Sequence, residues 1–340
     1  MNLKETLLTL CCTPGVSGHE EKIEQVISTM LKNYSNDIFV NSLGSVIANI
    51  SNPKNDYPKI LLEAHMDEIG LIVTSITDDG FIKVSNCGGV DVKLLIAQEV
   101  IVHGKSDLYG VVCSVPPHLN TKKDSLIKMD DICIDIGMNK QNAEKLVSPG
   151  DVVTYNFSPI MLHGNRIASK SLDNRSGVAA ILLALDKLKD KDYNCGVSVM
   201  FSSLEETSGK GALTGGYLTR PDISFCVDVN FAKSIGCPKS KCKDMGKGVM
   251  IGYSPTLDSK LSLKLKDIAE KSNIPHQMEI MSGLTSTDAD KISTLRGGIV
   301  TGLCSIPLKY MHSPIEVIDL NDLDSVASLL SEFILQYRKG

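Results

Sequence analysis

The chain has 340 residues, more than one simple domain usually needs and enough for two. Its apolar content of 42% and charged content of 22% are typical of a globular protein with a buried core. The formal net charge of -5 argues against nucleic acid and anionic membrane surfaces as partners. No apolar run approaches the roughly 18 residues of a membrane span. The N-terminus also lacks the features of a signal peptide, so we expect a cytoplasmic protein.

Ten cysteines are scattered along the chain and include no CxxC pair. Neither the Cys11-Cys12 pair nor Cys237 and Cys242 has the spacing of a zinc knuckle. We therefore expect most of the cysteines to be small buried apolar side chains in a reducing compartment.

The first 71 residues alternate between helical and extended patterns. Residues 17–20, Ser-Gly-His-Glu, have the form of a capping box, and apolar residues follow at helical spacing over 23–31. Two strand-like segments come next, at 39–50 and 57–65.

The pattern changes near residue 72, and little helical periodicity remains before about residue 165. Residues 71–86 have the pattern of a hairpin with a turn at Asp78-Asp79-Gly80. Further short strands are predicted at 99–115, 131–138 and 150–159. We predict a compact β domain over 72–165, inserted into an α/β domain made of 1–71 and 166–340.

Helix and strand patterns alternate again after residue 165. Helices are predicted over 176–190, 258–273 and about 321–338, and strands over 196–206 and 223–230. This order predicts an α/β fold that is split by the inserted β domain.

Three of the predicted strands end in side chains that can bind metal ions: His65 and Asp67, Glu205 and Glu206, and Asp228. Sites in open α/β sheets gather at the carboxyl ends of the strands. Two loop residues join this set, because Asp173 stands just before an apolar helix and His312 stands in a predicted tight turn.

Each of these groups also has an ordinary structural role open to it. Asp173 can cap its helix, Asp228 can cap a neighbouring loop, and the other side chains can be solvated. Together, however, two histidines and three carboxylates form a mixed nitrogen and oxygen set that suits zinc, cobalt or manganese. Such a set can hold two ions if one carboxylate bridges them.

The stretches AHMDEIG, SLDNRSG, SLEETSGKGA, CVDV and PLKYMHSPIEV occur in this order along the chain. In sequence and spacing they resemble the M42 family of dinuclear-metal aminopeptidases, the glutamyl-aminopeptidase and tetrahedral-aminopeptidase group. The resemblance extends from about residue 5 to 338. It implies a phosphopeptidase-like mixed-sheet α/β catalytic domain with an inserted small β-barrel-like dimerisation domain. It also implies dimers that assemble into a twelve-subunit shell, although the sequence is compatible with a dimer too.

The resemblance further implies a role for each candidate residue. In this assignment the first metal is bound by His65 and Asp228, the second by Glu206 and His312, and both by Asp173. Glu205 is the implied general base, and Asp67 orients His65. The sequence alone allows Glu205 and Glu206 to exchange roles. The stretch DVNFAKSIGCPKSKC, which begins at Asp228, departs from the Thr-His-Ala-like run of relatives, so we expect the pocket beside this ligand to differ.

The implied reaction is the removal of N-terminal residues from short peptides by water that two metal ions activate. Zinc or cobalt is the expected metal, and manganese is compatible.

An alternative is deacylation of N-acyl amino acids, which needs a cation for the substrate carboxylate that the sequence does not identify. An endoglucanase is a weaker alternative, because the chain has no Trp and only 5% aromatic residues to form sugar platforms. A non-catalytic assembly or regulatory protein is disfavoured because all seven expected site residues are present. Selectivity is expected to lie in pocket walls such as residues 283–291.

Overall fold

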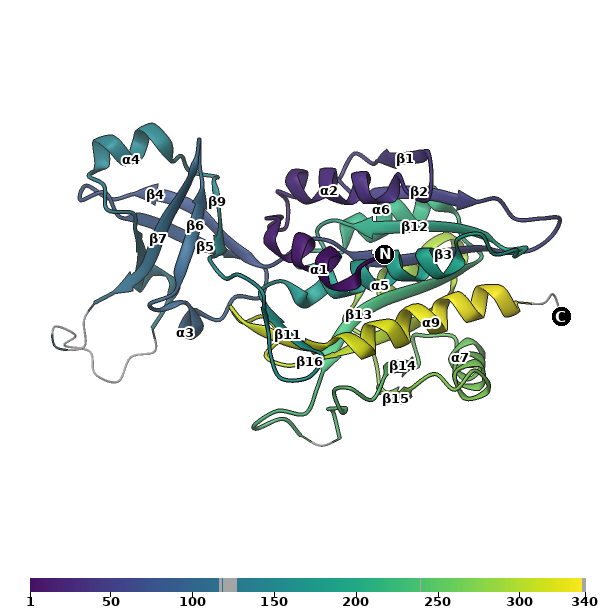
Figure 1. Cartoon of the computed structure of the whole chain (residues 1–340). Helices are drawn as coiled ribbons and strands as arrows, with labels where there is room; N and C mark the ends of the chain where they lie inside the picture. The colour runs from purple at the N-terminus through teal and green to yellow at the C-terminus, as the bar shows by residue number, and fades with distance from the viewer. Residues whose placement is uncertain (116–117, 119–126, 239, 338–340) are drawn as a thin grey trace.

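The computed structural model describes residues 1–115, 118, 127–238 and 240–337. Its strands form an eight-stranded mixed sheet, a three-stranded sheet and a closed six-stranded barrel. In Figure 1 the barrel lies at one end of the molecule, beside the layered α/β part. The predicted fold class, a mixed-sheet α/β unit with an inserted β barrel, is confirmed.

The eight-stranded sheet has, in spatial order, β1 (Asp37–Val40), β2 (Val46–Ser51), β12 (Gly196–Ser202), β3 (Lys59–His65), β13 (Ile223–Phe231), β16 (Val300–Leu308), β14 (Val249–Tyr253) and β15 (His276–Ile280). The four central strands β12, β3, β13 and β16 are parallel. They are buried on both faces, which explains why their sequences are nearly continuous apolar runs. Their carboxyl ends therefore meet at one edge of the sheet.

Helices cover both faces of this sheet. The larger core cluster packs one face against α1 (Leu3–Cys12), α2 (Glu21–Leu31), α5 (Leu172–Leu188), α7 (Ser259–Lys271) and α9 (Leu320–Gln336). The other face packs against α6 (Lys210–Thr219) and α8 (Asp288–Ile292), with the short η2 (Leu295–Gly297) beside them. The last helix was predicted to reach residue 338, which lies outside the described residues. Among the described helices, none combines the length and apolarity that crossing a bilayer requires.

The barrel is made of β4 (Gly70–Ile76), β5 (Ile82–Cys87), β8 (Ile132–Asp135), β7 (Asp107–Ser114), β6 (Glu99–His103) and β9 (Val152–Tyr155). The predicted hairpin is confirmed, because β4 and β5 pair in antiparallel fashion around a turn at 78–80. The barrel has its own apolar core, and three short helices lie between its strands: α3 (Val92–Leu95), η1 (Met129–Asp131) and α4 (Lys140–Leu146).

The chain enters and leaves the barrel beside the same edge of the large sheet. β3 ends at His65 and β4 begins at Gly70, so only four residues separate them. On the return, β10 (Ile160–Met161) and β11 (Arg166–Ser169) lead into α5, and β17 (Glu316–Asp319) pairs with β11 to complete the three-stranded sheet. Both connections thus lie next to residues of the candidate site.

Two predictions about local structure are wrong. Residues 17–20 do not form a capping box: α2 begins at Glu21, and its N-cap Glu20 makes no capping hydrogen bond. Instead the Ser17 hydroxyl lies 2.9 Å from that of Thr207, and the Glu20 carboxylate accepts the amides of Gly18 and Leu204. Both side chains serve tertiary contacts that the local sequence pattern does not contain.

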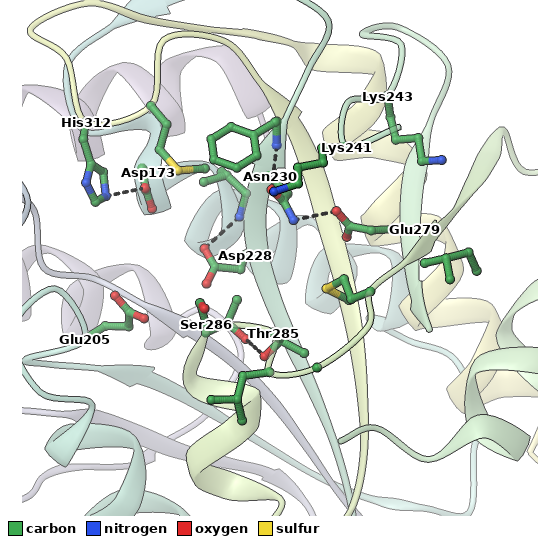
Figure 2. Close-up of a pocket in the computed structure, with 18 of the residues that line it drawn as sticks. Asp173, Glu205, Asp228, Asn230, Lys241, Lys243, Glu279, Thr285, Ser286 and His312 are labelled. Carbon is green, nitrogen blue, oxygen red and sulfur yellow. Dashed lines mark hydrogen bonds and ion pairs between the residues drawn. The ribbon is translucent and has the colours of Figure 1, made fainter. Parts of the chain in front are cut away.

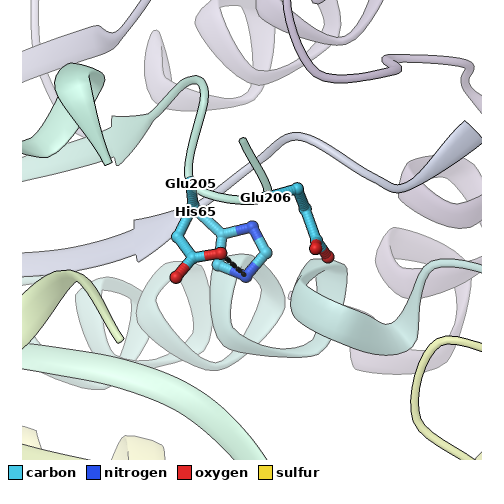
Figure 3. A group of neighbouring side chains, drawn as sticks. All are labelled: His65, Glu205 and Glu206. Atoms are coloured by element: carbon cyan, nitrogen blue, oxygen red, sulfur yellow. Dashed lines mark ion pairs between the residues drawn. The ribbon is translucent and has the colours of Figure 1, made fainter. Parts of the chain in front are cut away.

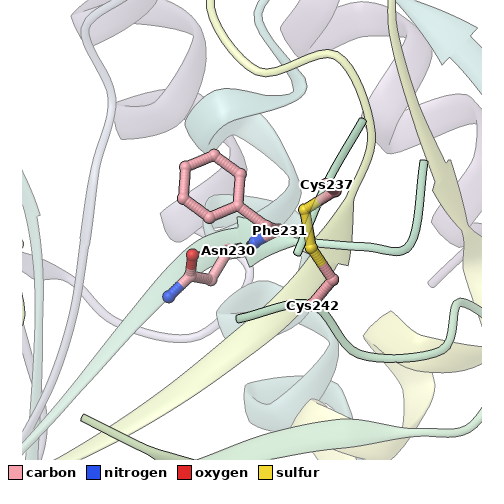
Figure 4. The surroundings of a disulfide bond; sticks show 4 residues. All are labelled: Asn230, Phe231, Cys237 and Cys242. Carbon is pink, nitrogen blue, oxygen red and sulfur yellow. Dashed lines mark hydrogen bonds between the residues drawn. A yellow bond between two sulfur atoms is a disulfide. The ribbon is translucent and has the colours of Figure 1, made fainter. Parts of the chain in front are cut away.

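The expectation that most cysteines are buried free thiols is also wrong. Cys237 and Cys242 form a disulfide (Figure 4). Of the eight free cysteines only four are buried, namely Cys11, Cys195, Cys226 and Cys304.

Candidate metal centre

The seven residues singled out from the sequence meet at the carboxyl edge of the central strands. They come from the ends of β3 and β12, from β13, from the start of α5 and from the turn before β17; they are His65, Asp67, Asp173, Glu205, Glu206, Asp228 and His312. Figure 2 shows Asp173, Glu205, Asp228 and His312 around one pocket. The parallel strands thus bring together side chains that are up to 247 positions apart, because their carboxyl ends share one edge.

One group of potential metal ligands consists of His65, Asp173 and Asp228. The Nε2 atom of His65 lies 3.1 Å from Oδ1 of Asp173 and 3.7 Å from Oδ1 of Asp228. All three side chains are buried. Their ligand atoms lie within 4.8 Å of one another, so one cation can contact all three.

A second group consists of Asp173, Glu206 and His312. The Nε2 atom of His312 lies 3.3 Å from Oδ2 of Asp173 and 3.3 Å from Oε2 of Glu206. Asp173 therefore belongs to both groups and turns a different oxygen toward each histidine. It is not the cap of the regular helix, because Asn174 precedes that helix and accepts the backbone amide of Gly177 at 3.0 Å.

Glu205 lies beside these groups without joining either of them. Its Oε2 atom is 4.0 Å from Nε2 of His65 (Figure 3). Its side chain is 18% exposed, whereas that of Glu206 is 4% exposed. A third possible ligand group combines His65 with both glutamates, so proximity alone does not separate their roles.

Asp67 lies behind His65 and links it to the glutamates. Its two carboxylate oxygens accept the backbone amides of Glu205 and Glu206, each at 3.1 Å. Its Oδ1 atom is 3.5 Å from Nδ1 of His65, a buried nitrogen with no other polar partner among the described residues. One buried carboxylate thus holds both the imidazole and the turn that carries the glutamates.

The electrostatics of the site show an excess of buried acid. Burial raises the pKa of Glu205 to about 9 and that of Glu206 to about 7, and it also raises that of Asp228. Hydrogen bonds to Asp173 and Glu206 raise the pKa of His312 to about 11. Carboxylates outnumber histidines here, so the buried carboxylates repel one another when they are ionised. Bound divalent cations would relieve that repulsion.

Sequence reasoning missed Glu316, which holds two of the site residues in place. Oε2 of Glu316 accepts the backbone amide of Asp173 at 3.0 Å, and Oε1 accepts that of His312 at 2.9 Å. The residue is 2% exposed. The sequence offers only a weak signal, because Glu316 is one of two acidic residues, with Asp319, at the ends of the short strand that follows His312.

Sequence reasoning also missed a buried ion cluster that joins the two chain segments of the site. Nζ of Lys170 lies 2.6 Å from Oε2 of Glu68, and the guanidinium of Arg175 lies 3.9 Å from Oε1 of Glu68. Glu68 follows Asp67, while Lys170 and Arg175 flank Asp173. The cluster therefore fixes the loop of Asp173 against the end of β3.

The pocket over the centre has a volume of about 640 Å³. The metal-ligand candidates line one side, and the opposite wall comes from Asn230, Lys241 and residues 279–287. Part of the predicted wall, residues 283–287, is thus present. The loop that carries Lys241 is closed by the Cys237–Cys242 disulfide, and residue 239 within it lies outside the described residues.

The chain is similar to known proteins over most of its length. The family model for M42 glutamyl aminopeptidase matches residues 44–329. A lysyl aminopeptidase of Pyrococcus furiosus is 34% identical over 329 residues, which cover 93% of this chain and 92% of the relative.

Two solved structures are similar over nearly the whole chain. An aminopeptidase of Desulfurococcus kamchatkensis, 32% identical, has a TM-score of 0.92 over 98% of this chain and 95% of its own. The TET1 peptidase of Pyrococcus horikoshii, also 32% identical, has a TM-score of 0.87 over 99% of this chain and all of its own. That peptidase can assemble into a tetrahedron or a large octahedral shell.

Proposed function

The chain belongs to the M42 glutamyl aminopeptidase family, and on this basis we propose that it removes N-terminal residues from short peptides with two divalent metal ions at the centre described above. The main supporting observation is that Asp173 turns one carboxylate oxygen toward His65 and the other toward His312. That arrangement suits a carboxylate shared by two ions.

The donor set fits two such ions. His65 and Asp228 would hold the first ion, Glu206 and His312 the second, and Asp173 both. Mixed imidazole and carboxylate ligands suit zinc or cobalt, and manganese is compatible. When bound, the two ions acidify water and polarise the scissile carbonyl.

The side chains around the ions would supply positioning and proton transfer. Glu205, more exposed to the pocket than Glu206, would take a proton from the attacking water and pass it to the leaving amine. The charge of the bound metal ions would lower the pKa of Glu205 and so favour its ionised form, which a general base requires. Asp67 would fix the orientation and tautomer of His65, as carboxylates behind metal-bound histidines do.

We assign residues 1–71 and 166–340 to a catalytic domain and residues 72–165 to a dimerisation domain. The closed barrel with its own core supports this division. The assembly stated for the Pyrococcus horikoshii relative supports a homo-oligomer, with dimers that assemble into a dodecamer. We further propose that the protein acts in the cytoplasm.

The proposed function is tested by stripping the protein with a chelator, resupplying zinc, cobalt or manganese, and offering peptides with free and acetylated N-termini. Metal-dependent cleavage of free N-termini only is the expected result. Activity on acetylated amino acids alone would favour the deacylase alternative. No activity with any of the metals would contradict an enzymatic role. The family match favours peptide hydrolysis over the deacylase and endoglucanase alternatives.

A further inference from the structure

We propose that Lys241 binds a carboxylate group of the peptide substrate and so sets the selectivity of the pocket. This inference rests on the proposed peptidase function and names the chemistry of the substrate that the site favours. Lys241 lines the same pocket as Asp173, Glu205 and His312. Figure 2 shows its amine directed toward Asn230, on the side of the metal-ligand candidates.

Lys241 carries a charge that the protein leaves unpaired. Within the described part of the chain, its amine forms no ion pair and no hydrogen bond. The nearby Lys233, by contrast, lies 2.8 Å from a carboxylate oxygen of Asp244. An exposed cation in the wall of a pocket is available to a ligand.

The other two charged side chains of this wall, Glu279 and Lys243, are of opposite sign. Glu279 is 5% exposed, and its two oxygens accept hydrogen bonds from Asn230 at 2.5 Å and from Ser305 at 2.8 Å. Burial raises the pKa of Glu279 to about 7, although the charge of nearby Lys243 favours its ionised form. Figure 2 shows the amine of Lys243 turned away from the metal-ligand candidates. Glu279 is thus hydrogen-bonded within the wall and Lys243 is turned away, so Lys241 is the charged side chain of this wall that faces a ligand near the metal-ligand candidates.

The backbone of Lys241 is anchored, which limits the region that its amine can reach. The amide of Lys241 donates to the carbonyl of Pro238 at 2.9 Å, and the next residue, Cys242, is buried in the disulfide. The amide of Lys243 then donates to the carbonyl of Phe231 at the end of β13, and its carbonyl accepts the amide of Lys233. A cation on such an anchored segment loses less conformational entropy on binding than one on a free loop.

The carboxylate must come from the peptide close to the bond that is cut, because Lys241 and the metal-ligand candidates share one pocket. Two parts of a short peptide offer this chemistry: the side chain of an N-terminal Asp or Glu, and the free C-terminus of a dipeptide or tripeptide. The deacylase alternative also needs a cation to bind the substrate carboxylate, and Lys241 would be such a cation.

Two pairs of peptides separate these sources. Glu-Ala-Ala-amide against Gln-Ala-Ala-amide tests the side chain, because the members differ only in that charge. Ala-Ala against Ala-Ala-amide tests the C-terminus. We would measure kcat/KM for all four peptides with the metal-loaded full chain, its variants K241A, K241R and K241E, and the control K247A. Lys247 is exposed on the same chain segment but does not line the pocket.

We expect the wild-type protein to prefer the charged member of at least one pair by about tenfold or more, as one charge-assisted contact provides. The ratio of kcat/KM for the charged and uncharged members should fall toward one in K241A. It should persist in K241R and K247A and fall below one in K241E. If the wild-type protein cleaves the uncharged peptides but shows no preference for the charged ones, the role of Lys241 is overturned and the proposed function stands. The same holds if K241A keeps the preference. Failure to cleave any of the four peptides would overturn the proposed function and this inference with it.

Discussion

Glu316 accepts a hydrogen bond of 3.0 Å from the backbone amide of Asp173, a residue 143 positions earlier in the chain. Its second carboxylate oxygen accepts the amide of His312. One buried side chain thereby sets the separation of two residues that we assign to the second metal. Glu316 is a positioning residue, since it does not itself join either ligand group.

Replacing Glu316 by Gln should weaken metal binding without removing a ligand. A Gln side chain offers only one acceptor oxygen, so one of the two amides loses its partner. We expect a 10- to 100-fold loss of zinc affinity, measured by competition with a chelator, and recovery of turnover when zinc is in excess. The exposed Glu144 provides the control E144Q. Equal zinc affinities for E316Q and the wild-type protein would contradict the positioning role.

The two adjacent glutamates should respond differently to the same substitution. E205Q should retain two metal ions and lose turnover by about 10²- to 10⁴-fold, because it removes a base rather than a ligand. E206Q should lose one ion. Metal content and kcat measured on both variants decide the assignment, and loss of an ion in E205Q alone would show that the roles are exchanged.

Metal binding should release protons. In the metal-free protein, hydrogen bonds to Asp173 and Glu206 raise the pKa of His312 to about 11, so the ring is protonated at pH 7. That proton must leave before Nε2 can bind a metal, and affinity should therefore rise with pH across the range from 6 to 9. Calorimetry in buffers of different ionisation enthalpy measures the number of protons released. A pH-independent affinity with no proton release would refute this account of His312.

The buried pair of Lys170 and Glu68 should matter for stability. K170M leaves the carboxylate of Glu68 buried beside Arg175 alone, and removal of one partner of such a pair costs about 3–5 kcal/mol. Urea unfolding of the full chain would measure this loss. The exposed pair of Lys54 and Asp192 offers the control K54M, for which we expect less than about 1 kcal/mol. Equal losses in the two variants would contradict the prediction.

This pair also sets a pH dependence. Burial opposes ionisation of Glu68, but the charges of Lys170 and Arg175 outweigh burial and lower its pKa below the ordinary 4.5. A lowered folded-state pKa contributes stability above pH 4.5 that is lost as the pH falls further. The difference in stability between wild-type protein and K170M should therefore shrink on acidification below pH 4.5, and a constant difference would argue against this coupling.

Because Cys237 and Cys242 form a disulfide, the number of reactive thiols should change on reduction. Under denaturing conditions without reductant, eight cysteines should react with a thiol reagent, and all ten should react after reduction. Ten reactive thiols before reduction would show that Cys237 and Cys242 are unpaired.

The main features of the fold and of the site followed from the sequence because their signals are local and ordered. His65, Glu205 and Asp228 each stand at or near the end of a strongly apolar strand, and parallel strands place such ends at one edge. The change from alternating helices and strands to short strands near residue 72 likewise indicated the barrel.

Other features depend on partners far away in the chain, which no local pattern contains. Glu316 is one of two acidic residues at the ends of a four-residue strand, and its partner Asp173 is 143 positions away. Ser17 bonds to Thr207 instead of capping a helix, at a separation of 190. Lys241 is one of many lysines in the sequence, and only the folded pocket distinguishes it from the others.

The proposed role of Asp173 is to serve two metal ions at once. It is tested most directly by titrating metal-free protein with zinc and measuring, at each point, the ions bound per subunit and the hydrolysis of Gln-Ala-Ala-amide. Our account predicts two ions per subunit, full activity only when both are bound, and weaker binding of both in D173N. Full activity with a single ion, or two undiminished sites in D173N, would contradict it.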